Sequence, residues 1–240
     1  MLVLASNSPR RKQLLALGGW DFIVVAPQVD EHVFPGEMPQ DYVRRLAESK
    51  ARAARQALVG DACVMTGIDN NRSQETIILA ADTTVAHREA LAESYEILGK
   101  PADAAQAEAM LRRLRGQVHQ VFTGLAVWRE AEGSLLSDVV ATDVWMRDYD
   151  DEEMLAYIAT SDPLDKAGAY AIQHPVFRPV QNLQGCYANV MGLPVCHAAR
   201  LLTQFGCPPA SDIVQGCQQA HEFTCPVFRK AKAEVGWLVE

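Results

Sequence analysis

The sequence lacks several features that would exclude or assign whole classes of protein. No stretch of its 240 residues reaches the ~18–20 consecutive apolar residues that a membrane-spanning helix needs, so we expect no membrane span. The N-terminus does not have the order of a secretion signal, because its short apolar run precedes the first basic residues. A phosphate-binding loop of the form G-x-x-x-x-G-K-[ST] is absent, which disfavours a kinase or a motor ATPase.

The six cysteines include no C-x-x-C pair. Without a secretion signal, we expect reduced thiols and a cytoplasmic protein. Cys217, His221 and Cys225 have the i, i+4, i+8 spacing that would align them on one helix face, where they could hold zinc. This spacing matches no common zinc module, and Pro226 would disturb the helix, so an ordinary docked or frayed tail is the favoured interpretation.

Acidic residues outnumber basic ones, which gives a net charge of −8. This charge disfavours a general nucleic-acid or anionic-membrane surface, so a site for an anionic substrate must be made locally. The apolar fraction of 49% and the charged fraction of 22% are typical of a soluble globular protein. The length fits one domain, or one domain with an appendage.

The N-terminal stretch predicts a local anion site. Leu2 to Ala5 reads as a buried strand, and Ser8 and Pro9 suit the N-cap and first position of a helix that ends near Gly18. The helix N-terminus would then present free backbone N–H groups beside Arg10 and Arg11, a combination that binds phosphate. The plainer alternative is a capped surface helix with basic residues.

Hydrophobic patterning predicts alternating helices and strands along the rest of the chain. We expect further strands over 22–25, 76–81, 118–128 and 135–146, a strand start at 62–65, a mobile loop over 66–75, and helices over 41–58, 103–115, 148–160 and 192–205. In the helix over 41–58 most charged residues should form a solvated face, while Lys50 is a candidate to point back toward the loops.

Two acidic residues follow predicted strands, where α/β proteins place functional side chains. Asp82 follows the apolar run 76–81, which makes it a candidate general base or metal ligand, although an aspartate in this position often only caps a turn. Glu31 stands in the loop 27–39 after the second predicted strand. Three adjacent polar residues in such a loop are usually only solvated.

Several separate motifs resemble those of the Maf family of nucleoside triphosphate pyrophosphatases. They are, in chain order, L-A-S-N-S-P-R-R at 4–11, A-D-T at 81–83, G-K-P at 99–101, G-Q-V-H-Q-V with T-G at 116–124, D-K-A-G-A-Y-A-I-Q at 165–173 and N-V-M-G-L-P at 189–194. The resemblance covers about residues 1–205 and leaves 206–240 as a C-terminal extension. It implies a mixed α/β fold, with two lobes around an elongated sheet and a deep cleft, and a homodimer.

The resemblance also implies an activity: hydrolysis of a nucleoside triphosphate to the monophosphate and pyrophosphate with a divalent cation, Mg²⁺ or Mn²⁺. The motifs look most like the branch that acts on dTTP and UTP, with modified pyrimidine nucleotides as a further possibility. By position, Asp82 matches the family's proton acceptor, and Asp82 and Glu31 are the expected metal ligands. The residues matching those tied to substrate choice are Arg10, Thr83 and Gln173, and those matching polar cleft residues are Ser6, Arg11, Glu31, Lys50 and Lys100.

Three expectations follow for the site. Arg11, Lys50 and Lys100 should bind phosphate oxygens, and the Gln173 amide should pair with the edge of thymine or uracil, unless it merely anchors its own loop. Two other classes of function stay open: a nucleotide-binding regulator of cell division with little catalysis, and a structural partner that acts through its tail. Release of pyrophosphate from dTTP separates the enzyme from both.

Overall fold

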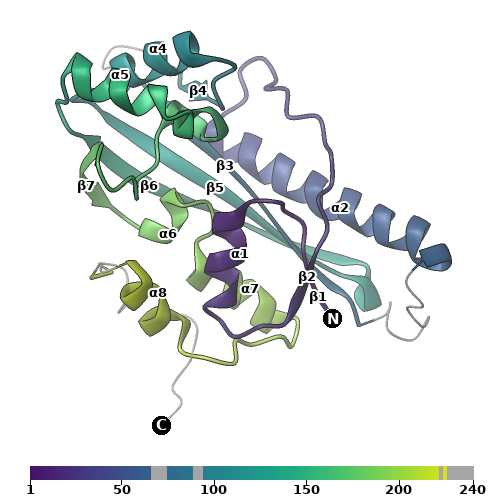
Figure 1. The fold of residues 1–240 in the computed structure, drawn as a ribbon. Coiled ribbons are helices and arrows are strands. Elements are labelled where there is room, and N and C mark those ends of the chain that lie inside the picture. Colours follow the sequence, from purple (N-terminus) through teal and green to yellow (C-terminus); the bar gives the residue numbers. More distant parts are fainter. Residues whose placement is uncertain (66–74, 89–93, 222–223, 226–240) are drawn as a thin grey trace.

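A single mixed sheet of seven strands runs through the protein (Figure 1). In this computed structural model residues 1–65, 75–88, 94–221 and 224–225 are described. The strands are β1 (Leu2–Leu4), β2 (Phe22–Val24), β3 (Ile77–His87), β4 (Glu96–Leu98), β5 (Val118–Arg129), β6 (Ser134–Met146) and β7 (Val180–Gln184). Their order is β2-β1-β3-β5-β6-β7, and β4 pairs with β3. β1 is parallel to β2 and β3, whereas the other pairs are antiparallel.

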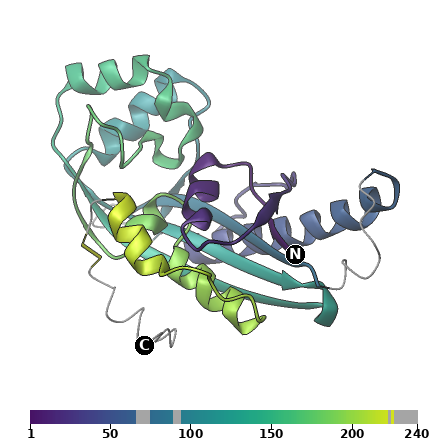
Figure 2. The ribbon, with the colours of Figure 1, turned by 60° about the horizontal axis from the view of Figure 1, so that its bottom comes forward.

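Helices cover both faces of the sheet and one of its ends (Figures 1 and 2). The helices are α1 (Pro9–Ala16), α2 (Pro39–Met65), α4 (Ala104–Leu114), α5 (Asp151–Ala159), α6 (Tyr187–Val190), α7 (Val195–Gln204) and α8 (Ile213–His221). α2 packs on one face, and α1, α6, α7 and α8 pack on the opposite face. α4 and α5 form a second lobe with the 3-10 turns η2 (Asp162–Asp165) and η3 (Ala167–Ala169). The predicted mixed α/β fold is therefore confirmed.

The two-residue period of β3 divides the core between the two faces. Ile78 and Ala80 are buried against α2, while Leu79 and Ala81 are buried against α1 and α7. The extended backbone continues this alternation into the polar residues that follow. Consecutive side chains of β3 therefore reach helices on opposite sides of the sheet.

One edge of β3 has a gap in its strand pairing. β5 pairs with β3 from Ile77 to Ala86 without a break. On the other edge, β1 pairs up to Leu79 and β4 begins to pair only at Val85. Residues 80–84 of β3 thus lie between the end of one partner and the start of the next.

Some expected boundaries are wrong. Asp82 does not follow the strand but lies in the middle of β3, because the apolar run stops at the polar segment 82–84 while the extended backbone continues. Residues 62–65 are not a strand start; they continue α2, since a four-residue apolar run cannot distinguish strand from helix. The helix expected from 148 begins later, where Asp150 forms a capping box with Glu153.

Patterning also missed three short elements, β4, β7 and α6, which have at most five residues each. The expected strands 118–128 and 135–146 are confirmed as β5 and β6, which pair as a hairpin, and the expected helix 41–58 is confirmed within α2, which has a buried face. The expected loop 66–75 lies, apart from Glu75, outside the described residues. Within the part of the chain that the structure describes, no helix has the length and apolar character to cross a membrane.

The close approach of α2 to β5 gives a test of the packing. A Cβ atom on Gly124 would lie 2.2 Å from the backbone oxygen of Val43, a helix atom that cannot rotate away. We expect Gly124→Ala to lower the free energy of unfolding by about 3 kcal/mol, the upper end of typical overpacking costs. Gly99→Ala is the matched control, because a Cβ there meets nothing within 4 Å. Equal denaturation midpoints for the two variants would contradict this packing.

Candidate active site

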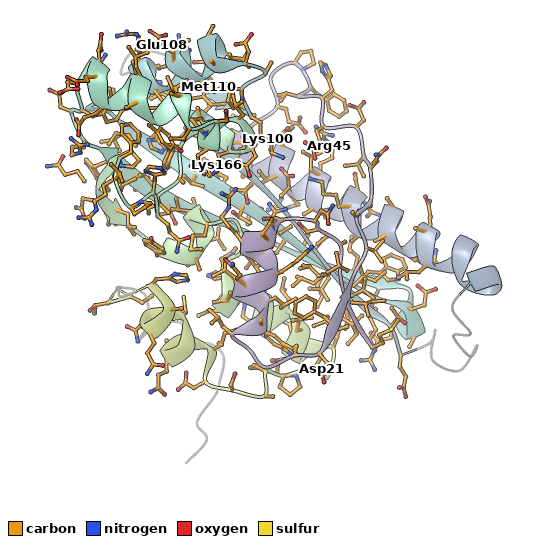
Figure 3. The ribbon with its side chains drawn as sticks, viewed as in Figure 1. Asp21, Arg45, Lys100, Glu108, Met110 and Lys166 are labelled. Carbon is orange, nitrogen blue, oxygen red and sulfur yellow. The ribbon has the colours of Figure 1, made fainter. Side chains whose placement is uncertain are left out.

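A cavity of about 760 Å³ lies where β3 lacks a strand partner on one edge. Residues from both lobes line it, including the N-terminal turn of α1, residues 82–85 of β3 and the segment 165–175. Figure 3 shows Lys100 and Lys166 on the side of the α4–α5 lobe that faces α1 and α2. The expected cleft between two lobes is thus present, and all nine residues expected at the site line it: Ser6, Arg10, Arg11, Glu31, Lys50, Asp82, Thr83, Lys100 and Gln173.

A triad of charges stands on the α2 side of the cavity. The Lys50 Nζ atom lies 2.6 Å from Oδ1 of Asp82 and 2.6 Å from Oε1 of Glu31. Asp82 is 6% exposed, so its carboxylate is withdrawn from water, whereas the Glu31 side chain is half exposed. Lys50 does point back from α2 toward the loops, and one ammonium group therefore joins the two acids.

Burial and the shared lysine push the pKa values of the two acids apart. Burial raises the pKa of Asp82 above its usual value, and the charges of Lys50 and Arg11 oppose that shift without cancelling it. Burial also acts upward on the pKa of Glu31, but the hydrogen bond and charge of Lys50, together with the charges of Lys100 and Arg11, outweigh it, so that this pKa is lowered. A carboxylate of raised pKa is the better proton acceptor, and one of lowered pKa is a permanent anion.

Two α2 side chains that the sequence reading did not assign to the site hold the loop that carries Glu31. The Tyr42 hydroxyl donates to the backbone oxygen of Glu31 at 3.0 Å. Arg45 binds both carboxylate oxygens of Glu37 at 2.6 and 2.7 Å and donates to the His32 backbone oxygen. The loop is thereby fixed to the same helix that carries Lys50.

Arg11 joins three segments on the opposite side of the sheet. Its guanidinium donates to the Gly192 carbonyl at 2.8 Å, to the Thr83 hydroxyl at 3.0 Å and to the Ser6 hydroxyl at 3.3 Å. All three acceptors are neutral oxygens. Burial lowers the pKa of Arg11, and the nearby Asp82 counteracts this. The side chain therefore ties α1, β3 and the turn before α7 together.

A buried chain of hydrogen bonds supports Thr83 from behind. The Thr83 hydroxyl lies 2.9 Å from that of Thr123, its register partner on β5, and Thr123 donates to the Asn189 backbone oxygen. The Asn189 amide donates in turn to the Val121 carbonyl and the Thr142 hydroxyl. Sequence reasoning gave Thr123 and Asn189 no role. Their only signal was their place in two of the motifs.

Arg10 and Lys100 are the cations that the described structure leaves available to a ligand. Neither makes an ion pair with any residue that the structure describes, and both line the cavity. Arg10 stands in the first turn of α1, which is capped as expected: the Ser8 side chain accepts from the Arg11 backbone N–H, and Pro9 occupies the first position. The N-terminus of α1 and the cations Arg10 and Lys100 together favour a polyanionic ligand.

A loop with many internal contacts, residues 162–168, forms the cavity wall on the side of the α4–α5 lobe. Lys166 is 7% exposed, and its ammonium group lies 2.8 Å from Oδ1 of Asp162 and 2.6 Å from Oδ1 of Asp165. Gly168 has a φ of +69°, and a Cβ there would lie 2.8 Å from Val85. The backbone of this loop is therefore packed directly against β3.

Gln173 follows this loop at the rim of the cavity. Its side-chain nitrogen lies 3.2 Å from Nδ1 of His221, the last residue of α8. In the described part of the chain the amide nitrogen therefore contacts the C-terminal extension, outside its own loop.

Two candidate metal sites can be compared. Asp82 and Glu31 point their oxygens at one position, which Lys50 occupies here, and hard oxygen donors suit magnesium. No group of three or more His, Cys, Asp or Glu residues that could hold a metal occurs among residues 1–65, 75–88, 94–221 and 224–225. The alignment of Cys217, His221 and Cys225 on one helix face is wrong, because α8 ends at His221 and Cys225 lies beyond the helix.

Similarity to known proteins agrees with this architecture. Residues 1–205 match the family described as Maf-like protein. A protein of Citrifermentans bemidjiense named dTTP/UTP pyrophosphatase is 44% identical over 206 residues, which cover 85% of this chain and 95% of that protein. Proteins of the same name from Chlorobium phaeovibrioides and Symbiobacterium thermophilum are 43% and 41% identical, over 81% and 86% of this chain and 91% and 95% of their own lengths. The chain therefore belongs to the Maf-like protein family.

Proposed function

We propose that this protein is a nucleoside triphosphate pyrophosphatase that acts on dTTP and UTP, with modified pyrimidine nucleotides as a further substrate class. The names of the similar proteins support this substrate class. The observation that carries the proposal is the buried Asp82 carboxylate, of raised pKa, in a cavity that also holds the free cations Arg10 and Lys100. A base next to a polyanion site is what hydrolysis of a phosphoanhydride requires.

The proposed hydrolysis needs a water molecule and the side chains described above. Asp82 accepts a proton from a water molecule as the water oxygen bonds to the α-phosphorus. The bond from the α-phosphorus to the bridging oxygen breaks, and pyrophosphate leaves with that oxygen. Lys100 and Arg10 neutralise the charge that develops on the departing pyrophosphate. The division-regulator alternative needs no base, so pyrophosphate release from dTTP decides between them.

A divalent cation fits the two carboxylates on the α2 side. Magnesium binds few protein carboxylates and keeps water and phosphate ligands, so Asp82 and Glu31 suffice to hold Mg²⁺ or Mn²⁺ once Lys50 turns toward phosphate. Bound there, the ion would polarise the phosphate oxygens as a Lewis acid. The lowered pKa of Glu31 keeps it ionised, as a ligand must be.

Nucleobase selection is assigned to the rim of the cavity. Gln173 is exposed there, and a side-chain amide matches the acceptor and donor on the thymine or uracil edge better than those of cytosine or adenine. Arg10 and Thr83 are the further candidates. We also propose that the protein is cytoplasmic and forms a homodimer. Sedimentation of the purified protein tests the homodimer.

The first prediction from the proposed function concerns the general base, Asp82. Asp82→Asn should lower kcat for dTTP by about 10²–10⁴-fold, the usual contribution of a general base, while the affinity for dTTP changes only a few-fold. Asp143→Asn is the matched control, since Asp143 is a half-buried β6 aspartate that does not line the cavity. Near-normal turnover of Asp82→Asn at saturating Mg²⁺ would refute the assignment.

The second prediction concerns the cation. A chelator should abolish pyrophosphate release, and added Mg²⁺ or Mn²⁺ should restore it. Glu31→Gln should raise the Mg²⁺ concentration for half-maximal rate by about tenfold or more, because a ligating charge is lost. The neighbouring Asp30→Asn should not, as Asp30 does not line the cavity. An unchanged Mg²⁺ requirement in Glu31→Gln would remove Glu31 from the ligand set.

The third prediction concerns the phosphates. Lys100→Ala should weaken binding of a non-hydrolysable triphosphate analogue by about 1.5–3 kcal/mol, that is, roughly ten- to a hundredfold, and binding of the monophosphate much less. Lys12→Ala is the control, because Lys12 lies on α1 outside the cavity lining. Calorimetric titration gives both constants. Equal losses for triphosphate and monophosphate would place Lys100 away from the β- and γ-phosphates.

A further inference from the structure

The C-terminal extension reaches the rim of the cavity through one side chain. His221 lies outside the segment 1–205 that matches the family, yet its Nδ1 atom is 3.2 Å from the Gln173 amide nitrogen. The His221 ring is stacked on Tyr187, with ring centroids 5.1 Å apart and an angle of 28° between the planes. Its Nε2 atom is buried without a partner among the described residues, so Nδ1 makes the polar contact.

α8 is fixed to the body of the protein, so His221 does not hang from a loose segment. Ile213 and Val214 are buried in the core formed with α1 and α7. The Ser211 hydroxyl donates to the Leu17 carbonyl at 2.7 Å, and the Ala210 N–H donates to the Gly18 carbonyl at 2.8 Å. The helix bearing His221 is therefore anchored to the end of α1, whose other end lines the cavity.

The Gln173 amide carries two N–H groups. One points at Nδ1 of His221. Burial raises the pKa of the Tyr187 hydroxyl, and a hydrogen bond with the Gln173 side chain opposes that shift. The contact with His221 is made by the amide nitrogen, so the carbonyl oxygen of the amide is left for a ligand.

We propose that His221 is a positioning residue for nucleobase selection, because its contact with the Gln173 nitrogen directs the amide oxygen toward the cavity. The inference rests on the proposed function, in which Gln173 meets the nucleobase. A fixed carbonyl oxygen accepts from the N3–H of uracil or thymine. The corresponding nitrogen of cytosine is itself an acceptor and leaves both groups without a hydrogen-bond partner, which lowers the affinity for cytosine.

UTP and CTP differ only at this edge, which makes their kcat/KM ratio the readout. His221→Phe keeps a stacking ring but no acceptor, and we expect it to lower the UTP-to-CTP ratio about three- to tenfold. His221→Asn offers an acceptor oxygen close to the position of Nδ1, and it should keep the ratio within about twofold of the original. Gln219→Ala, an exposed α8 residue, is the control with unchanged kinetics.

A double-mutant cycle tests whether the effect passes through the amide. In a Gln173→Ala background, His221→Phe should change the ratio no further. An unchanged ratio in His221→Phe overturns the inference. So does an equal fall in kcat/KM for both nucleotides together with a lowered melting temperature, because that result describes a purely structural role.

Failure of the inference and failure of the proposed function have different signatures. If Gln173→Ala releases pyrophosphate with an unchanged UTP-to-CTP ratio of kcat/KM, Gln173 does not contact the nucleobase. That result would overturn the inference but not the proposed hydrolysis. If the unaltered protein releases no pyrophosphate, the proposed function falls. Binding of the α,β-imido analogues of UTP and CTP then still measures selectivity, and equal ratios for His221→Phe and the unaltered protein overturn the inference.

Discussion

The site depends on an interruption in the hydrogen bonding of one strand edge. β3 is paired without a break on the β5 side, but on the other side β1 stops at Leu79 and β4 starts at Val85. A fully paired strand would have no room for a cavity along residues 80–84. The unbroken pairing with β5 keeps this segment extended, so the gap opens the sheet without loosening it.

Because successive side chains of a strand point to opposite faces, the polar residues of β3 lie on both faces of the sheet. Asp82 and Thr83 are adjacent in the chain, but Asp82 meets Lys50 of α2 and Thr83 meets Arg11 of α1. The register explains the contrast in their surroundings. Gly124, opposite Asp82, lets α2 approach closely, while Thr123, opposite Thr83, starts the hydrogen-bonded chain to Asn189. One face therefore carries the acid–lysine pair, and the other carries a network of neutral acceptors that orients a guanidinium.

Sequence reasoning succeeded where local patterns are strong and failed where distant residues decide. The α1 cap and the long buried face of α2 follow from spacing alone, and the nine residues expected at the site all line the cavity. Asp82 was placed after a strand instead of within one, because hydrophobicity marks burial in the core and not the extent of extended backbone. The partners of Gln173 could not be predicted, since His221 lies 48 positions away and no pattern couples them.

The three cations expected to bind phosphate, Arg11, Lys50 and Lys100, differ in what they contact. Arg11 gives its guanidinium donors to neutral oxygens of three segments, and Lys50 is held between two acids, so in the described structure both serve first to organise the site. Lys100 has no such ion pair there. A ligand phosphate would displace little to reach Lys100, whereas at Lys50 it must compete with two carboxylates at 2.6 Å. A divalent ion on those carboxylates would remove that competition, and it would thereby couple the binding of cation and phosphate through a single lysine.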